Sequence, residues 1–153
     1  MRRGKIMGKI FGIALVCFMI ALMLPFGGFW NWSQALAQET KTWYVDDDLA
    51  DYPDADFSKI QEAVDAASAG DTIVVYAGIY QEHVTLDKSV ILKTDEGATI
   101  DGGGTLSTVT INADGCIVSG FNITGSGSRP HGNAGIRINS NYNTISGNTI
   151  SGN

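Results

Sequence analysis

Apolar and polar residues alternate in short runs along the second half of the chain. Val109 and Ile111, and again Ile136 and Ile138, lie two positions apart, which is the period of a β-strand with one buried face. Glycine, serine and asparagine fill the intervals between such pairs, and these residues favour tight turns. The pattern predicts many short strands separated by sharp corners.

The pattern repeats with a period of 27 residues. The matched pairs are Val109 with Ile136, Ile111 with Ile138, Asn112 with Asn139, Val118 with Ile145, Gly120 with Gly147 and Ile123 with Ile150. One unit is too narrow to bury its own apolar face, whereas stacked units pair their backbones about 4.8 Å apart and share a core of aliphatic side chains. We therefore expect an all-β fold, a parallel β-solenoid over residues 71–153.

Asn112 and Asn139 are expected to stand one above the other at a corner of this solenoid. Asparagine tolerates a left-handed backbone, and its amide can form a hydrogen bond with the copy above. The coils before residue 109 should be less regular in length. The sequence predicts a structural asparagine ladder at this corner.

An amphipathic helix is predicted for residues 57–70, because the apolar period changes there from two to that of a helix. The apolar stripe consists of Phe57, Ile60, Val64 and Ala67. Ser58 and Gln61 have the spacing of a capping box. The helix should cover the first coil, and the acidic segment before it, residues 38–56, should contain a first strand.

The first 37 residues have the features of a secretory signal peptide. Basic residues precede an apolar run at 10–26, and Ala35 and Ala37 form a small-x-small cleavage motif. The apolar run is slightly shorter than a permanent membrane span requires, although an uncleaved leader remains the alternative. In either case the remainder is expected to be secreted, periplasmic or at the cell surface.

The net charge of −6 conceals an uneven distribution. The leader contains four of the 10 basic residues and none of the 16 acidic ones, so six basic and sixteen acidic residues remain, a net charge of −10. So acidic a chain is not expected to bind nucleic acid or an anionic membrane, except for membrane contact through an uncleaved leader. Beyond the leader Cys116 stands alone, so no internal disulfide is expected.

Several segments resemble a known family. They are FSKIQEAVDAASAGDTIVVYAGIYQEHV at 57–84, KSVIL at 88–92, TIDGGG at 99–104 and the NTISGN repeats. Together they resemble the N-terminal part of NosD-like proteins, the carbohydrate-binding and sugar-hydrolase (CASH) repeats of the pectin-lyase-like superfamily. The resemblance covers about residues 42–153 and implies a right-handed parallel β-helix, here a truncated member. It specifies a fold and leaves the activity open.

Two groups of residues raise the question of a metal. The namesake of the NosD-like group is linked to copper delivery, but His83, His131 and Cys116 lack ligand spacing, and Cys116 reads as a core residue. The aspartates of residues 46–56 could attract calcium, although they lack the spacing of an EF-hand. A solvated acidic segment is the other interpretation. We expect no cofactor, with calcium left open.

Signs of catalysis are weak. The G-x-Y-x-E motif at 78–82 matches the opening of pectin methylesterases, but the glutamines of that family do not follow it, which favours a structural turn with a stacked tyrosine. Enzymes that cleave polysaccharides place paired carboxylates on successive coils. The 27-residue register instead places Asp114 beneath Asn141, while Asp87 lies one period before Asp114. No catalytic residue is assigned.

The best candidates for ligand contact are Arg129 and His131 in the long loop 125–135, together with Arg137 at the start of the next strand. They could contact a glycan, or the loop could be an ordinary exposed one. The first function considered is a non-catalytic extracytoplasmic module that contacts a glycan or an envelope protein. The second is a polysaccharide lyase, hydrolase or esterase whose active site lies on missing coils. An uncapped last coil should also allow self-association.

Overall fold

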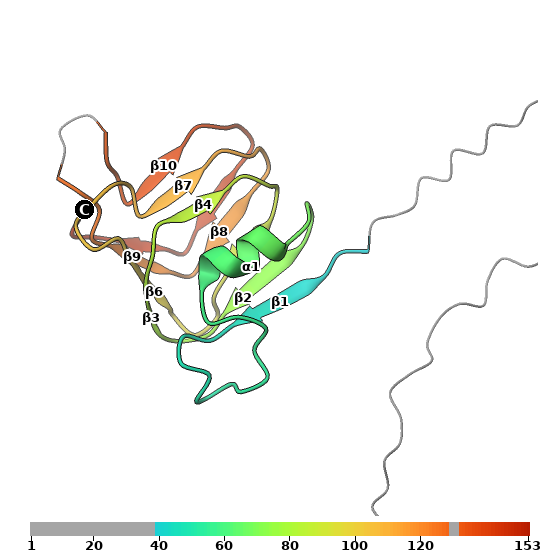
Figure 1. Cartoon of the computed structure of the whole chain (residues 1–153). Helices are drawn as coiled ribbons and strands as arrows, with labels where there is room; N and C mark the ends of the chain where they lie inside the picture. Colours follow the sequence, from blue (N-terminus) through green and yellow to red (C-terminus); the bar gives the residue numbers. More distant parts are fainter. Residues whose placement is uncertain (1–38, 129–131) are drawn as a thin grey trace, which may run out of the picture. The chain divides into compact units, whose positions relative to one another are not determined.

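The protein is described by a computed structural model that covers residues 39–128 and 132–153. Over these residues the chain winds into an all-β solenoid, in which every strand pairs in parallel with strands one coil away (Figure 1). The predicted fold class is confirmed, while the handedness of the winding stays a prediction. The predicted signal peptide lies outside the described residues.

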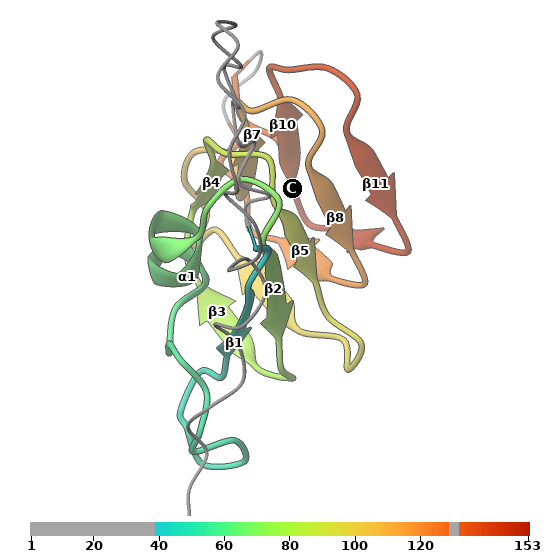
Figure 2. The same ribbon diagram turned by 90° about the vertical axis from the view of Figure 1, so that its right-hand side faces the viewer.

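Three parallel sheets form the walls of the solenoid. Sheet A consists of β1 (Thr42–Val45), β2 (Thr72–Val75), β5 (Ile91–Lys93), β8 (Ile117–Ser119) and β11 (Thr144–Ser146). Sheet B consists of β3 (Ile79–Gln81), β6 (Thr99–Asp101), β9 (Asn122–Thr124) and β12 (Thr149–Ile150). Sheet C consists of β4 (Val84–Leu86), β7 (Val109–Ile111) and β10 (Ile136–Ile138). Figure 2 shows the strands of sheet A side by side.

The 27-residue period is confirmed for the last coils, where Ile138 pairs with Ile111 in adjacent parallel strands. The earlier coils are irregular, as expected. Leu86 pairs with Ile111, a separation of 25 residues. Because this register differs by two residues from the 27-residue period, Asp87 does not lie beneath Asp114, and that predicted match is wrong.

The core is a column of side chains that point inward from all three sheets. Its largest fully buried members include Ile73, Leu86, Leu92, Ile100, Ile111, Phe121 and Ile123. Side chains of paired strands stack directly on one another because the strands are in register. Burial of one such side chain contributes roughly 1.5–3 kcal/mol. The stack therefore stabilises the described residues, in which Cys116 is a free thiol.

The helix α1 (Ile60–Ala66) is shorter than the predicted 57–70. Phe57 forms a parallel bridge with Val45 and so belongs to the edge of sheet A. Lys59, the N-cap, has an extended backbone, and so does Ala67, the C-cap that follows the last helical residue. Tertiary pairing of the first residues has therefore overridden their helical pattern. The buried side of α1 contains Ile60, Ala63 and Val64.

The predicted capping box is wrong, because the helix is capped from the solenoid. The backbone N–H groups of Ile60 and Gln61 donate to the two carboxylate oxygens of Glu82 at 2.9 and 3.0 Å. At the other end the Lys88 ammonium donates to the carbonyls of Val64, Asp65 and Ala67 at 3.1, 2.7 and 3.0 Å. A negative carboxylate at the N-terminus of the helix and a positive ammonium at its C-terminus both interact favourably with the helix dipole.

Helix α1 and the acidic segment before it cover the edge of the first strand in each sheet. Gln61 reaches from α1 to β4, where its amide accepts from Thr85 N at 2.7 Å and donates to Thr85 O at 3.4 Å. Asp47 accepts from Ile79 N, at the edge of β3, at 3.1 Å. In sheet A, residues 56–57 bond to Tyr44 O. Edge groups that would otherwise be open to another chain are thus occupied.

Among residues 39–128 and 132–153, no helix has the length and hydropathy needed to cross a bilayer.

Candidate functional site

The acidic segment 46–56 forms a loop, and its own carboxylates hold this loop in place through hydrogen bonds. Its carboxylates accept from backbone amides: Asp46 from Tyr52 N (3.4 Å), Asp47 from Ile79 N (3.1 Å), Asp48 from Ala50 N (2.8 Å) and Asp56 from Tyr44 N (3.0 Å). Asp46 is only 1 % exposed, so the expectation of a solvated segment is wrong for this residue. The run is a structural element of the first coil.

Asp46, Asp47 and Asp48 each offer an oxygen, and these oxygens lie within 4.8 Å of one another. Calcium prefers such oxygen ligands. The same three carboxylates already accept the hydrogen bonds that shape the loop, however, and these bonds account for their positions without an ion. Calcium binding therefore stays a prediction.

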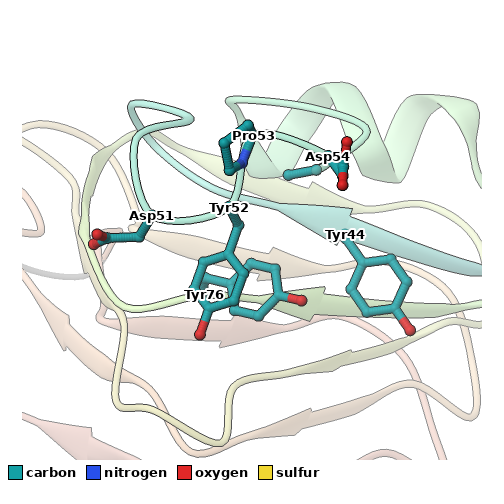
Figure 3. A pocket seen from close by; sticks show the side chains of 7 residues that line it. Tyr44, Asp51, Tyr52, Pro53, Asp54 and Tyr76 are labelled. Carbon is teal, nitrogen blue, oxygen red and sulfur yellow. The ribbon is translucent and has the colours of Figure 1, made fainter. Parts of the chain in front are cut away.

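Beside this loop three tyrosines line a recess of about 370 Å³ (Figure 3). Tyr52 stacks on Tyr76 with ring centroids 3.4 Å apart and planes 4° apart, and Tyr44 lies 6.1 Å from Tyr76. Asp51 and Asp54 contribute to its lining. Tyr44 and Tyr76 occupy outward positions at sheet A, and this alternation along the strands is the signal by which the surface could have been predicted.

The stacked tyrosine also fastens the acidic loop to the solenoid. The Tyr52 hydroxyl donates to Glu96 Oε1 at 2.9 Å, and this hydrogen bond raises the pKa of Tyr52 above its usual value. Burial raises the pKa of Tyr76. Both hydroxyls therefore stay protonated at neutral pH. The recess therefore lies where the loop packs against sheet A, and its tyrosines have a structural role there.

A second hollow lies on the outward face of sheet C, with a volume of about 290 Å³. We call it the polar groove, and its lining residues are His83, Thr85, Leu106, Ser107, Thr110, Asn112, Gly132, Asn133, Arg137 and Asn139. Thr85, Thr110 and Arg137 stand in one column, because β4, β7 and β10 are in register. The groove offers hydroxyls, amides and one guanidinium.

Arg137, the one predicted contact residue within the described residues, is exposed in this groove. Its Nε donates to Asn139 Oδ1, and its Nη1 donates to Gly132 O, both at 3.3 Å. These long bonds orient the guanidinium and leave donors for a ligand. Arg129 and His131 lie outside the described residues, so the structure does not place them.

The predicted asparagine ladder is confirmed on the same face. Asn139 Nδ2 donates to Asn112 Oδ1 at 2.8 Å. Neither asparagine uses the left-handed backbone that this residue tolerates, and Tyr142 adopts that conformation a few residues later. The ladder therefore rests on the amide bond between coils and not on an unusual backbone.

His83 faces the polar groove with both ring nitrogens engaged. Nδ1 lies 3.0 Å from Ser107 O, and Nε2 lies 3.0 Å from Thr105 Oγ1. Because a carbonyl oxygen can only accept, Nδ1 carries a hydrogen, and in the neutral imidazole Nε2 then accepts from the Thr105 hydroxyl. His83 thus ties the strand connection before β4 to the loop before β7.

Cys116 is a core residue, as expected. It is fully buried, and its Sγ lies 3.3 Å from Lys88 O. Burial raises the pKa of its thiol, which disfavours the thiolate that metals bind.

The residues of the G-x-Y-x-E motif make structural contacts, but Ile79–Gln81 form strand β3, so the interpretation of the motif as a turn is wrong. Tyr80 is buried, and its hydroxyl lies 3.1 Å from Tyr76 O and 3.3 Å from Val45 O. Burial raises the pKa of Tyr80 far above its usual range. Glu82 caps α1 as described above. Asp114 likewise acts between coils, accepting from Asn141 N at 2.7 Å in the predicted register.

Comparison with known proteins gives one informative match. A cell surface glycoprotein of Methanothermus fervidus is 39% identical to this chain over 98 residues. The match covers 61% of this chain and 16% of that protein, so the chain spans about a sixth of the relative's length. No family model and no solved structure matches. The chain is a β-helix repeat protein, and its assignment to the NosD-like group stays a prediction.

Proposed function

We propose that the chain is a non-catalytic, extracytoplasmic β-solenoid module of a cell-surface protein, and that it contacts a glycan through the polar groove. The observation that carries the proposal is the similarity to a protein named a cell surface glycoprotein. The stacked coils add a physical reason. Strands paired across coils form a stiff body with flat outer faces, which suits a building block of the envelope.

The chemistry of the groove supports glycan contact. Threonine hydroxyls and the paired amides of Asn112 and Asn139 can exchange hydrogen bonds with sugar hydroxyls, while Arg137 can pair with the carboxylate of an acidic sugar. The groove is shallow and open, as a surface that follows an extended chain must be. An envelope protein as the occupant is an outcome of the test below.

The enzymatic alternative has less support from the groove. Glycoside hydrolysis needs two carboxylates flanking the scissile bond. Of the described residues that line the groove, none is an aspartate or glutamate. A polysaccharide lyase, hydrolase or esterase activity would need residues from elsewhere.

Two measurements test the proposal. The first is fractionation of cells that express the full chain, where we expect the protein outside the cytoplasm. The second is a glycan array followed by titration calorimetry with the ligands it identifies. Arg137→Ala should weaken binding at least tenfold, whereas Lys93→Ala, which removes a cation from sheet A, should leave it unchanged.

Three results would count against the proposal. Release of reducing or unsaturated ends from a polysaccharide would favour the enzyme. If the groove bound an envelope protein and no glycan, the proposed glycan ligand would be wrong and a protein partner would take its place. Equal weakening by Arg137→Ala and Lys93→Ala would show a general charge effect and would remove the groove from the argument.

A further inference from the structure

Sheet B carries an acceptor sequence that none of the surfaces above uses. Strand β9 consists of Asn122, Ile123 and Thr124, and Asn-x-Thr is the acceptor for N-linked glycans in exported proteins. Ile123 is fully buried, whereas Asn122 is exposed and Thr124 is half-buried. Because side chains alternate along a strand, the core anchors Ile123 and turns Asn122 and Thr124 outward.

We propose that Asn122 is an N-glycosylation site. The inference rests on the proposed function in one respect, since only an exported chain meets the glycosyl donor. The sequence holds one other acceptor, Asn31-Trp32-Ser33, which lies within the predicted leader. The asparagines of the NTISGN repeats, by contrast, have isoleucine at the third position. Asn122 is therefore the acceptor of the mature chain.

The amide of Asn122 can carry a sugar without loss of its contact to the protein. Its Nδ2 donates to Gly97 O at 3.4 Å, which uses one of two hydrogens. In the transfer, Nδ2 bonds to the anomeric carbon of a sugar held on a lipid-linked phosphate. The carbon–oxygen bond to the phosphate breaks, and the phosphate leaves with the electron pair. The second amide hydrogen departs as a proton to a base of the transferase.

The neighbours of Asn122 give the glycan a physical role. Ile79, Thr99, Asn122 and Thr149 form one outward column, since the four strands of sheet B are in register. Ile79 is 65 % exposed, unusual for so large an apolar side chain. It lies two strands away from Asn122, roughly 10 Å. The first sugars of a glycan can lie over Thr99 and cover Ile79, while the polar groove on sheet C stays free.

The test uses the full chain with its leader, expressed in an archaeal host whose own surface protein carries an N-linked glycan in the same sample. Protein from the envelope fraction is digested with trypsin, and the peptide of residues 94–137 is analysed by mass spectrometry, since Pro130 blocks cleavage after Arg129. We expect a glycan mass on Asn122. Thr124→Ser should keep it, because the hydroxyl remains. Thr124→Val and Asn122→Gln should abolish it, and Thr149→Val, in the same column, should not.

The outcomes separate the two proposals. An exported chain that is unmodified at Asn122 would overturn the glycosylation site and leave the proposed function intact. That result is decisive, because the host's own surface protein carries its N-linked glycan in the same sample. Retention of the chain in the cytoplasm would overturn both. Modification that persists in Thr124→Val would place the glycan on another residue and would also overturn the site.

Discussion

At the scale of single residues, polar side chains complete the backbone hydrogen bonds that the first coil leaves open. Asp71 accepts from Lys41 N at 2.8 Å, from Ser68 N at 2.9 Å and from the Trp43 indole at 3.0 Å. It thereby ties β1, the end of the helical segment and β2 together. The bonds from the amides of Lys41 and Ser68, more than its other contacts, lower the pKa of Asp71 below its usual value.

This pKa shift predicts how stability depends on pH. Since the folded pKa lies below the unfolded value of about 3.9, the stabilisation is present above about pH 4 and is lost as the pH falls through the folded pKa. Asp71→Asn should lower the free energy of unfolding at pH 7 and flatten its decline below pH 4. Urea unfolding between pH 3 and 7 measures this, with Asp95→Asn, an exposed carboxylate, as the control. If the free energy of unfolding of Asp71→Asn declined below pH 4 as steeply as that of the unsubstituted chain, the prediction would be contradicted.

The cap of α1 gives a second prediction at this scale. Glu82→Gln leaves one oxygen for the two N–H groups of Ile60 and Gln61 and removes the charge. We expect a loss of about 1–2 kcal/mol in the free energy of unfolding, typical of a lost helix cap. Glu62→Gln, on the exposed first turn of the helix, should change it little. Equal effects in urea titrations would show that Glu82 is no cap.

At the scale of elements, strand pairing was predictable and the boundaries of α1 were not. Alternating apolar residues specify which side of a strand is buried, and a one-residue slip would turn all of them outward. The register of Ile111 beneath Ile138 could therefore be derived from local pattern alone. The start of α1 depends on Phe57, which satisfies a helical stripe equally well but pairs with Val45 in the folded chain.

Ile111 and Ile138, which pair in sheet C, allow the effect of burial to be compared for the same type of side chain. Ile111 is fully buried between coils, whereas Ile138, its partner one coil later, is 47 % exposed. Ile111→Ala should cost about 2–5 kcal/mol in the free energy of unfolding, because it leaves a cavity. Ile138→Ala should cost less than half as much. Comparable losses in denaturant unfolding would mean that the last coil is buried in solution.

At the scale of the whole molecule, the two ends of the solenoid differ. The first coil is covered by α1, Gln61 and the acidic loop. In the last coil Ile138 and Ile150 are 47 % and 49 % exposed, beside strands whose outer edges bond to no further strand within the described residues. Unpaired edges with apolar neighbours readily pair with another chain.

We therefore expect the isolated chain to self-associate through this coil. Sedimentation velocity at micromolar concentrations should show species larger than a monomer, and a lysine in place of Ile138 or Ile150 should shift them toward monomer. Lysine in place of Ile79, exposed on sheet B, serves as the control. A monomer at every concentration would refute the expectation.

What the sequence determined by itself is the repeating part of this protein. A period of two within strands and of 27 between coils leaves one economical arrangement, in which apolar residues stack and Asn112 meets Asn139. Such contacts follow from a repeated local pattern, so they can be read without knowledge of the fold.

The tertiary structure decided everything that does not repeat. Glu82 caps a helix more than twenty positions earlier in the chain, Gln61 pairs with a strand edge, and Tyr52 stacks on Tyr76. The polar groove likewise arises from the outward columns of three strands. These contacts depend on which distant segments pack together in the irregular coils, and a local repeat in the sequence carries no information about that packing.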